Sequence, residues 1–453
     1  MQRRVDRRSY LKGASSAGAI VALAGCLGDS DDGDDSDTGD DGSDGDDGSD
    51  DDSGDGATAD GSDDPIKFGN INPLTGSAST TGVPASQGAQ LAGQHLNSGV
   101  LAEEGFVSDL SADGGVLGRE VEIITTDSEV NPETGITRAR QLVEEEEAHA
   151  VTGCTSSAVG LAVSGYTSSV DTLLMTGGVQ TPALTGEDCQ RTTFRAGSST
   201  IQLNRGAASS LAELSDGNRV AVASPDSTFG RASAGAFLDA IQEFMPDAEI
   251  VSELYPEFGK GEYQNEIQQT LNADPDIFMS SIYPGSFISF IEEAKQLDFF
   301  EQVEYPYTGV GSTANITPAL GDDMPEMYSV ERYMFNYPDT DYNARFRGDY
   351  RDNFGDPPSG VPQLDYAANI AFAKAMERAG TTDTDEVIQE LEGMSYEAPE
   401  GTKRIRADDH LNIDEKIWFG KLTEVDWWEF YGLGELQTAS GEEVTPEPQA
   451  CQF

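Results

Sequence analysis

A Thr-Ser pair at the expected start of a helix is the first feature of this sequence that could bind a ligand. Thr155 and Ser156 follow the apolar run 150–153 and precede a segment rich in small residues. The first N–H groups of a helix have no partners within the helix, and the helix dipole favours negative charge there. The pair therefore predicts a site for a small anion such as a carboxylate, although Ser and Thr are also common as simple helix caps.

The sequence offers little chemistry for catalysis. Its three histidines, His95, His149 and His410, lie far apart in the chain, and none stands in a nucleophile motif beside a serine. No phosphate-binding loop of the Walker type occurs, and Gly309-Val310-Gly311 is only part of a dinucleotide-binding pattern. No Cys-x-x-Cys pair is present, so a structural zinc site is not expected. We therefore expect a binding protein that is not an enzyme and that uses no cofactor or metal.

Strands and helices that alternate along the chain must position the Thr-Ser pair. Short apolar runs predict strands at 66–71, 121–124, 150–153, 173–176, 220–223, 250–254 and 277–279. Apolar residues at helical spacing predict helices between these runs, and a long helix at 364–378 is expected to return to the first half. Such alternation predicts an α/β fold with parallel sheets that are covered by helices on both faces. Ligands of open parallel sheets bind beyond the carboxyl ends of the strands, so we expect the cleft between two such lobes to hold the site.

The chain is strongly acidic. It contains 82 Asp and Glu residues against 27 Lys and Arg residues, which gives a formal net charge of −55. Nucleic acid and anionic membrane surfaces are therefore not expected as partners, because both attract basic protein surfaces. The excess of acid with little lysine resembles the proteins of salt-loving archaea. In molar salt the Debye length is about 3 Å, so we expect a halophilic protein whose fold loosens at low salt.

The first 26 residues predict export and a lipid anchor. The pair Arg7-Arg8 precedes a short apolar segment, 13–25, which is too short to span a membrane. The end of this segment, Leu23-Ala24-Gly25-Cys26, resembles the lipobox of secreted lipoproteins, in which the cysteine carries the lipid. Residues 27–64 are almost entirely Asp, Gly and Ser, a composition that predicts a disordered acidic linker. We therefore expect Cys26 to tether the folded part to the extracellular face of the cell membrane.

Three further cysteines can form one disulfide. They are Cys154, Cys189 and Cys451. An exported protein can keep a disulfide, and an odd number of cysteines leaves one free thiol. The pairing of Cys154 with Cys189 is favoured, and the pairing of Cys189 with Cys451 is the alternative.

A series of short motifs extends in order from residue 65 to the C-terminus. The motifs are Pro73-Leu74-Thr75-Gly76, Asp127 with Asn131-Pro132, Gly153 followed by Thr155-Ser156-Ser157, Thr181-Pro182-Ala183-Leu184-Thr185, Phe194-Arg195, Phe229-Gly230, and Ala398-Pro399-Glu400-Gly401 through Asp409-His410. In this order they resemble the extracytoplasmic solute-binding proteins of ABC transporters, in the branch that binds branched-chain amino acids, amides and urea. The last motif resembles a segment of the amide- and urea-binding relatives.

The resemblance implies a type I periplasmic binding protein, with two Rossmann-like lobes and a hinge of several crossings that closes on the ligand. The expected division of the chain is 1–26 signal, 27–64 linker, 65–198 first lobe, 199–330 second lobe, 331–412 return to the first lobe, and 413–453 hinge and C-terminal segment.

The resemblance also assigns ligand-binding positions. They are Thr155, Ser156, Gly178, Gln180, Phe229 and Tyr283. The Thr-Ser pair falls where the family holds the ligand carboxylate. Gly178 and Gln180 fall where the family contacts the amino group, and Phe229 and Tyr283 fall at aromatic positions of the second lobe.

One departure from the family concerns the ligand's ammonium group. The amino-acid binders place an acidic residue in the turn after the strand near Tyr307, but the turn 309–313 of this chain has no carboxylate. A buried ammonium without a counter-charge is costly, and Asp226 is a candidate substitute. The expected function is capture of a branched-chain amino acid or similar small polar solute for an ABC permease. An amide or urea ligand, and a role as ligand sensor for a membrane receptor, stay open.

Overall fold

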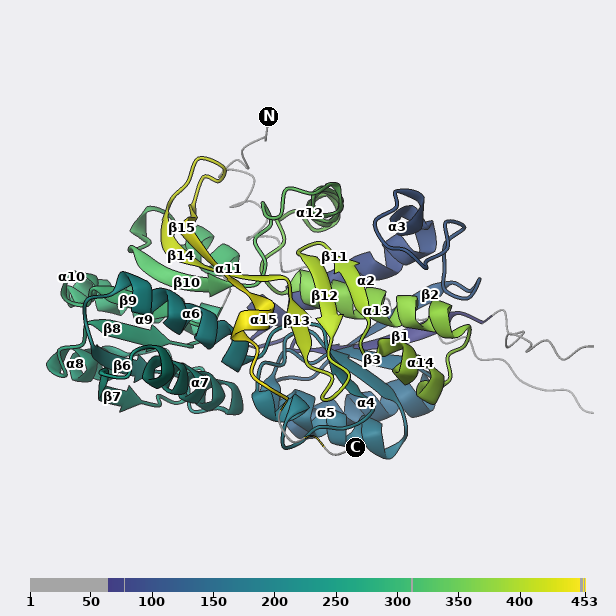
Figure 1. The fold of residues 1–453 in the computed structure, drawn as a ribbon, viewed down its shortest axis with the longest axis horizontal. Helices are drawn as coiled ribbons and strands as arrows, with labels where there is room; N and C mark the ends of the chain where they lie inside the picture. The colour runs from purple at the N-terminus through teal and green to yellow at the C-terminus, as the bar shows by residue number, and fades with distance from the viewer. Residues whose placement is uncertain (1–63, 77, 311–312, 449–450, 452) are drawn as a thin grey trace, which may run out of the picture.

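Two α/β lobes with a third, small sheet between them make up the protein (Figure 1). The computed structural model describes residues 64–453 apart from 77, 311–312, 449–450 and 452. The predicted fold class is confirmed, because each lobe contains a largely parallel sheet that is covered by helices. The predicted signal and lipid-attachment residue Cys26, and all but the last residue of the predicted linker, lie outside the described residues.

The first lobe is built on a five-stranded parallel sheet in the order β2-β1-β3-β4-β5. Its strands are β1 (Ile66–Asn72), β2 (Val121–Asp127), β3 (Ala150–Gly153), β4 (Leu173–Thr176) and β5 (Thr193–Arg195). Every residue of β3 and β4 is buried, as expected for central strands that are covered on both faces.

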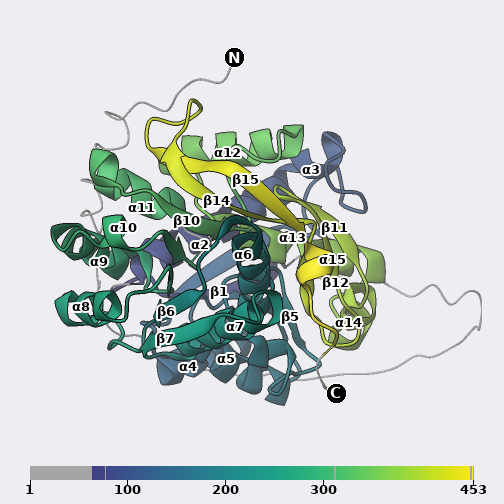
Figure 2. The same cartoon turned by 60° about the vertical axis from the view of Figure 1, so that its left-hand side comes forward.

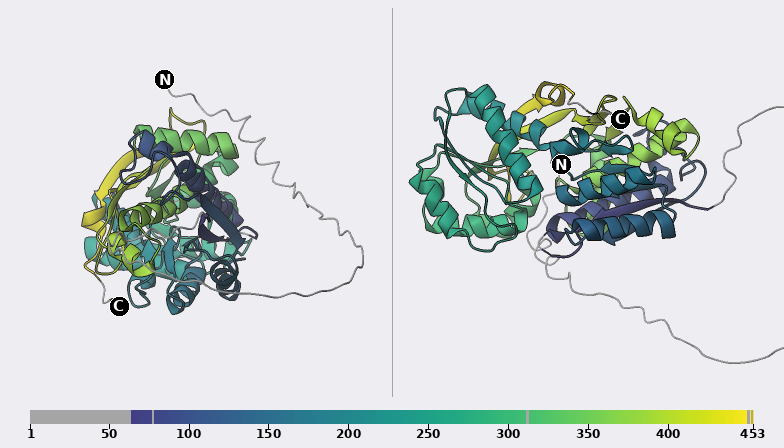
Figure 3. Two further views of the ribbon diagram at one scale, coloured as in Figure 1. Left: turned by 90° about the vertical axis from the view of Figure 1, so that its right-hand side faces the viewer. Right: turned by 90° about the horizontal axis from the view of Figure 1, so that it is seen from below.

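Two layers of helices cover this sheet, and the right panel of Figure 3 shows both lobes side by side. One layer contains α2 (Ser79–Ser98) and α13 (Pro362–Ala379), and the other contains α4 (Pro132–Arg140) and α5 (Ser157–Ser169). The α2 and α13 helices approach closely at Gly88, where a Cβ atom would lie 1.9 Å from the carbonyl oxygen of Pro362. The helix predicted at 364–378 is therefore confirmed as α13, and it packs on the first lobe. The smaller helices of this lobe are α3 (Val100–Glu103), the π turn Gln141–Glu145, the 3-10 turn Pro182–Thr185, α12 (Asp341–Phe354) and α14 (Thr384–Leu391).

The second lobe is built on a seven-stranded sheet in the order β15-β14-β10-β9-β8-β6-β7. Its strands are β6 (Arg219–Ala223), β7 (Glu249–Leu254), β8 (Ile277–Ser280), β9 (Tyr305–Thr308), β10 (Met327–Glu331), β14 (Lys416–Glu424) and β15 (Tyr431–Ser440). Its helices are α6 (Thr200–Leu214), α7 (Thr228–Phe244), α8 (Gln264–Asn272), α9 (Pro284–Gln296), α10 (Phe299–Gln302), α11 (Thr313–Leu320) and the 3-10 turn Gly321–Asp323. The five strands β6 to β10 pair in parallel, and two apolar clusters fill the two faces of the sheet.

Strands β14 and β15 form an antiparallel hairpin that extends the second sheet beyond β10. Alternate side chains of β14 enter different clusters, because Ile417 and Phe419 pack on one face of the sheet and Trp418 and Leu422 on the other. Residues 416–440, which the sequence assigned to a hinge and C-terminal segment, therefore belong to the sheet of the second lobe.

In the described part of the chain, three crossings connect the lobes before the C-terminal segment returns to the first lobe. Residues 196–199 link β5 to α6, residues 332–340 link β10 to α12, and Glu415 links β13 to β14. The small antiparallel sheet of β11 (Ser395–Ala398), β12 (Gly401–Ile405) and β13 (Asn412–Asp414) lies at this junction. The last helix, α15 (Gly441–Val444), packs against β13 and α6, so it also contacts both sides of the junction (Figure 2).

The disulfide joins Cys189 to Cys451, whose Cα atoms lie 5.8 Å apart. The favoured pairing of Cys154 with Cys189 is therefore wrong, and the alternative is confirmed. Cys154 has a free thiol that is fully buried between the first sheet and its helices, and burial raises its pKa. The C-terminus lies on the first lobe, where the rings of Phe194, His410 and Phe453 stack in succession.

Candidate functional site

A small cavity lies between the lobes, where the carboxyl ends of the strands of both sheets meet. It is lined by Thr81, Thr155, Gly178, Gln180, Phe229, Tyr283, Val310, Arg332 and Val361. The first four belong to the first lobe and the next three to the second, while Arg332 begins the second crossing and Val361 precedes α13. The free volume is about 20 Å³, which is room for about one water molecule. A ligand therefore enters only when the lobes move apart.

The structure brings together five of the six predicted ligand-binding residues. Thr155, Gly178, Gln180, Phe229 and Tyr283 line the cavity. Ser156 does not, because it is the buried N-cap residue of α5. Its side chain makes no capping hydrogen bond, so the simple capping interpretation does not hold for it. Ligand contact by these residues stays a prediction.

Thr155 is held by a chain of buried hydrogen bonds. Its backbone N–H and its hydroxyl both donate to Oδ1 of Asn72, over 3.2 and 2.5 Å. Asn72 in turn donates from Nδ2 to the buried carboxylate of Asp365 over 2.7 Å. Burial raises the pKa of Asp365, although the hydrogen bonds from Asn70 and Asn72 counteract this. Because both donors of Thr155 are occupied, a ligand carboxylate must replace Asn72 to use them.

The loop that carries Gly178 and Gln180 is held by Arg195. The buried guanidinium of Arg195 donates to the carbonyl oxygens of Val179 and Thr181, and over 3.1 Å to the hydroxyl of Thr185. Burial lowers the pKa of Arg195 to about 9.

Gly178 and Gln180 contribute to the cavity wall in different ways, the first by its small size and the second by a polar atom. A Cβ atom at Gly178 would lie 2.8 Å from Cγ2 of Thr155, so the two segments can meet only at a glycine. The buried Oε1 of Gln180 has no hydrogen-bond partner in the described part of the chain, and it is available to a ligand.

The second lobe contributes an aromatic wall. The ring of Tyr283 lies edge-to-face between two others, with centroid distances of 5.5 Å to Phe229 and 5.3 Å to Phe258. Phe229 lies in the first turn of α7, which Ser227 caps by accepting from the N–H of Gly230 over 3.1 Å. Burial raises the pKa of Tyr283 to about 12, so its hydroxyl keeps its proton.

Four lining residues were not predicted from the sequence, namely Thr81, Val310, Val361 and the one charged residue among them, Arg332. Its side chain is buried, with the residue 3 % exposed, and its Nη1 donates to the carbonyl oxygen of Ser198 over 3.3 Å. Its Nε has no hydrogen-bond partner among the described residues. Burial lowers the pKa of Arg332, but a guanidinium stays charged in proteins. The available signal was a basic residue directly after the strand 327–331, at the edge where ligands bind.

Comparisons with known proteins identify the family. A family model described as periplasmic binding protein matches residues 65–424. The chain belongs to the periplasmic binding protein family. No curated protein is significantly similar to it in sequence.

Solved structures of ABC-transporter binding proteins resemble this periplasmic binding protein. A solute-binding protein of Rhodopseudomonas palustris BisB5 in complex with 3,4-dihydroxybenzoic acid has a TM-score of 0.72 and 20% identity, covering 84% of this chain and 98% of that one. A periplasmic binding protein of Burkholderia mallei has a TM-score of 0.73 and 18% identity, covering 85% and 97%. A leucine-binding protein of Thermotoga maritima has a TM-score of 0.69 and 18% identity, covering 82% and 98%. At these identities the likeness shows the fold.

The charges around the cavity favour an anion. Arg332 is the one charged residue among the nine that line it. Asp226, the candidate counter-charge for an ammonium group, does not line the cavity and pairs instead with Arg231 over 2.7 Å at the surface. Among its lining residues, this binding protein therefore offers a cation to its ligand and no carboxylate, while Asp414, Glu331 and Glu400 lie near Arg332 outside the lining and partly offset its charge.

The described residues contain neither a candidate membrane-spanning helix nor a candidate metal site. Within them, no helix combines the length and the apolar character that crossing a membrane requires. In the same part of the chain, no three His, Cys, Asp or Glu side chains gather as metal ligands.

Proposed function

We propose that this periplasmic binding protein captures a small organic carboxylate with an apolar or aromatic body and delivers it to an ABC permease. The observation that carries this proposal is the buried guanidinium of Arg332 in a cavity without a lining carboxylate. A desolvated arginine with an unused N–H group is costly unless an anion completes its hydrogen bonds. A carboxylate is the planar anion that a guanidinium binds best.

The remaining lining residues suit the body of such a ligand. Phe229, Tyr283, Val310 and Val361 offer rings and methyl groups, and Gln180 offers an amide oxygen that can accept from a ligand hydroxyl. Among the similar structures, separate Rhodopseudomonas palustris proteins are in complex with 3,4-dihydroxybenzoic acid, 4-hydroxybenzoate and benzoate. These complexes support an aromatic acid as the first candidate.

A branched-chain amino acid is the second candidate, and the leucine-binding and branched-chain amino-acid transporter proteins of the same fold support it. Its carboxylate would satisfy Arg332 equally well. Its ammonium group, however, would be desolvated in a cavity whose lining provides no counter-charge. A neutral amide or urea would leave the guanidinium without an anion.

The test compares pairs of ligands that share a carbon skeleton and differ in one charged group. The purified protein in molar salt is titrated with benzoate and benzamide, and with 4-methylpentanoate and leucine, and thermal stability and heat of binding are recorded. A ligand at 100 times its Kd adds about 2.7 kcal/mol to stability. We expect benzoate to bind at least tenfold more tightly than benzamide. Equal binding of benzamide would overturn the carboxylate proposal, and binding of leucine alone would establish the second candidate.

The extracellular location with a lipid anchor at Cys26 is also part of this proposal, and it is supported by the order of the Arg pair, apolar segment and cysteine in the sequence. A Cys26→Ser variant is expected to appear in the medium instead of the membrane fraction. Retention of this variant in the membrane fraction would count against the anchor. Loss of ligand uptake on deletion of a neighbouring permease gene would distinguish transport from sensing.

A further inference from the structure

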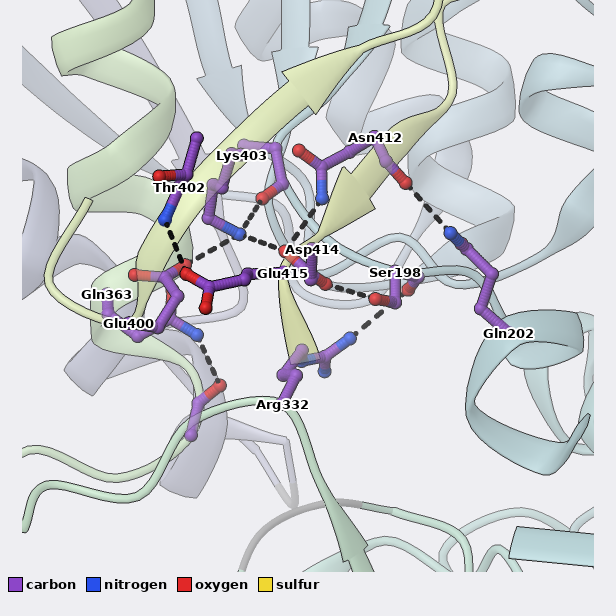
Figure 4. Close-up of polar contacts among 12 residues, drawn as sticks. Ser198, Gln202, Arg332, Gln363, Glu400, Thr402, Lys403, Asn412, Asp414 and Glu415 are labelled. Carbon is purple, nitrogen blue, oxygen red and sulfur yellow. Dashed lines mark hydrogen bonds and ion pairs between the residues drawn. The ribbon is translucent and has the colours of Figure 1, made fainter. Parts of the chain in front are cut away.

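A cluster of buried polar and charged side chains joins the crossings between the lobes (Figure 4). We call it the hinge cluster. Its members are Ser198, Arg332, Glu400, Lys403, Asn412 and Asp414, all of them buried. The cavity-lining residue Arg332 is one of them, so the cluster has direct access to the site.

Asp414, directly before the third crossing, is the centre of the cluster. Its two carboxylate oxygens accept from the hydroxyl of Ser198, from Nζ of Lys403, and over 2.8 Å from Nδ2 of Asn412. Ser198 belongs to the first crossing, so the bond between these two side chains joins two crossings.

Lys403 extends these contacts along the first crossing. It faces Asp414 in the register of β12 and β13, and its Nζ donates to the carbonyl oxygen of Ala196 over 2.9 Å. It also pairs with the carboxylate of Glu400 over 2.6 Å. Burial alone would lower the pKa of Lys403, but Asp414 and Glu400 raise it overall, so the ammonium stays charged.

Arg332, the first residue of the second crossing, connects this crossing to the first one. Its Nη1 donates to the backbone oxygen of Ser198, the same residue whose hydroxyl binds Asp414. One residue of the first crossing therefore contacts both the cavity arginine and the central carboxylate. These contacts join the first crossing to the second and to the residue directly before the third, so they depend on the relative position of the crossings.

We propose, in an inference that rests on the proposed function, that the hinge cluster positions Arg332 and the two lobes for ligand capture. It fixes the guanidinium of Arg332 toward the cavity and favours the nearly closed arrangement of the lobes in which that guanidinium meets the ligand. Asp414, Lys403 and Ser198 thus set affinity without touching the ligand. Affinity falls in proportion to the population of the competent arrangement, so weakening the cluster weakens binding.

The test uses a pair of matched serine variants in the full chain. Ser198→Ala removes the hydroxyl that binds Asp414 and leaves every charge of the cluster in place. Ser210→Ala is the control, because Ser210 is equally a buried serine, on α6, and its hydroxyl bonds only within that helix, to the carbonyl oxygen of Gly206. Asp414→Asn is the stronger variant of the same contact.

Two readouts separate positioning from general stability. Spin labels on exposed cysteines introduced at Thr137 of α4 and Gln268 of α8 report the distance between the lobes without ligand. Cys154 does not interfere, since its thiol is fully buried. Titration with benzoate and benzamide reports affinity and its dependence on charge.

We expect Ser198→Ala to lengthen the interlobe distance distribution of the ligand-free protein and to raise the Kd for benzoate about tenfold. Ser210→Ala is expected to change neither readout. A ligand-free distance distribution of Ser198→Ala identical to that of the native protein would overturn the inference, whatever the effect on stability. Failure of the native protein to bind any carboxylate would instead overturn the proposed function. The ligand-free distances would still show whether the hinge cluster favours the nearly closed arrangement of the lobes.

Discussion

The two walls of the cavity are built in different ways. The wall of the first lobe, with Thr155 and Gln180, is fixed by a hydrogen bond that Thr155 donates to Asn72 and by hydrogen bonds that Arg195 donates to the carbonyl oxygens on either side of Gln180. The wall of the second lobe, with Phe229 and Tyr283, is fixed by ring packing and by the cap of α7. Hydrogen bonds are directional and ring packing is more tolerant of shape. The first wall therefore sets how a ligand is oriented, and the second sets how much apolar surface it buries.

The largest expected effect comes from removing the support of the polar wall. Arg195→Ala leaves the buried carbonyl oxygens of Val179 and Thr181 without their donor, so we expect the free energy of unfolding to fall by about 4 kcal/mol. Arg191→Ala is the control, since its ion pair with Asp385 is exposed and worth less than about 1 kcal/mol. Chemical denaturation in molar salt measures both. Equal destabilisation by the two variants would show that the guanidinium of Arg195 does not hold the loop.

Arg332 stands between the two walls, and its replacement tests which of them governs affinity. Arg332→Gln is expected to weaken binding of benzoate by about 10- to 100-fold, because a hydrogen bond to a charged group is lost, and to leave binding of benzamide nearly unchanged. Arg332→Lys is expected to fall in between, since an ammonium keeps the charge but not the planar fork. Calorimetric titration gives the three affinities. A similar loss for benzoate and benzamide would indicate damage to the cavity rather than loss of the anion partner.

Much of the fold and of the cavity lining could be predicted from the sequence. The apolar runs of both lobes gave the positions of β1 to β4 and β6 to β8, and small residues after 153 marked α5. Five predicted ligand positions line one cavity because each follows a strand whose carboxyl end is fixed by parallel pairing.

Features that depend on distant contacts could not be predicted. The β14–β15 hairpin needs β10 as a partner, and the Cys189–Cys451 disulfide needs the C-terminus to cross to the first lobe. Arg332 was missed for the same reason, because only the path of the second crossing brings it to the cavity. Two of the three carboxylates near it, Asp414 and Glu400, are more than 60 residues away in the chain.

The hydrogen-bonded side of the junction should also respond to pH, unlike the aromatic wall. Burial raises the pKa of Glu400 to about 7 in the folded protein, against 4.5 ordinarily. Between these values the folded state keeps a proton that the unfolded state has lost, so this group's contribution to stability is complete below pH 4.5 and disappears as pH rises through 7. Glu400→Gln is expected to flatten that part of the stability profile, as measured by denaturation at several pH values. An unchanged slope would mean that Glu400 ionises at its ordinary pKa.

The smallest expected effect concerns the aromatic wall itself. Phe229→Leu keeps an apolar side chain in the cavity but removes the ring that meets Tyr283, an interaction worth about 1 kcal/mol. We expect binding of benzoate to weaken about fivefold and binding of 4-methylpentanoate to stay the same, because an aliphatic body gains little from an aromatic neighbour. Phe258→Leu is the matched control, since Phe258 packs on the opposite side of Tyr283 and does not line the cavity. If Phe258→Leu weakened benzoate binding as much as Phe229→Leu, the wall would act through the position of Tyr283 and not through direct contact. The second wall would then depend on fixed geometry as the first does, and the contrast between the two walls would disappear.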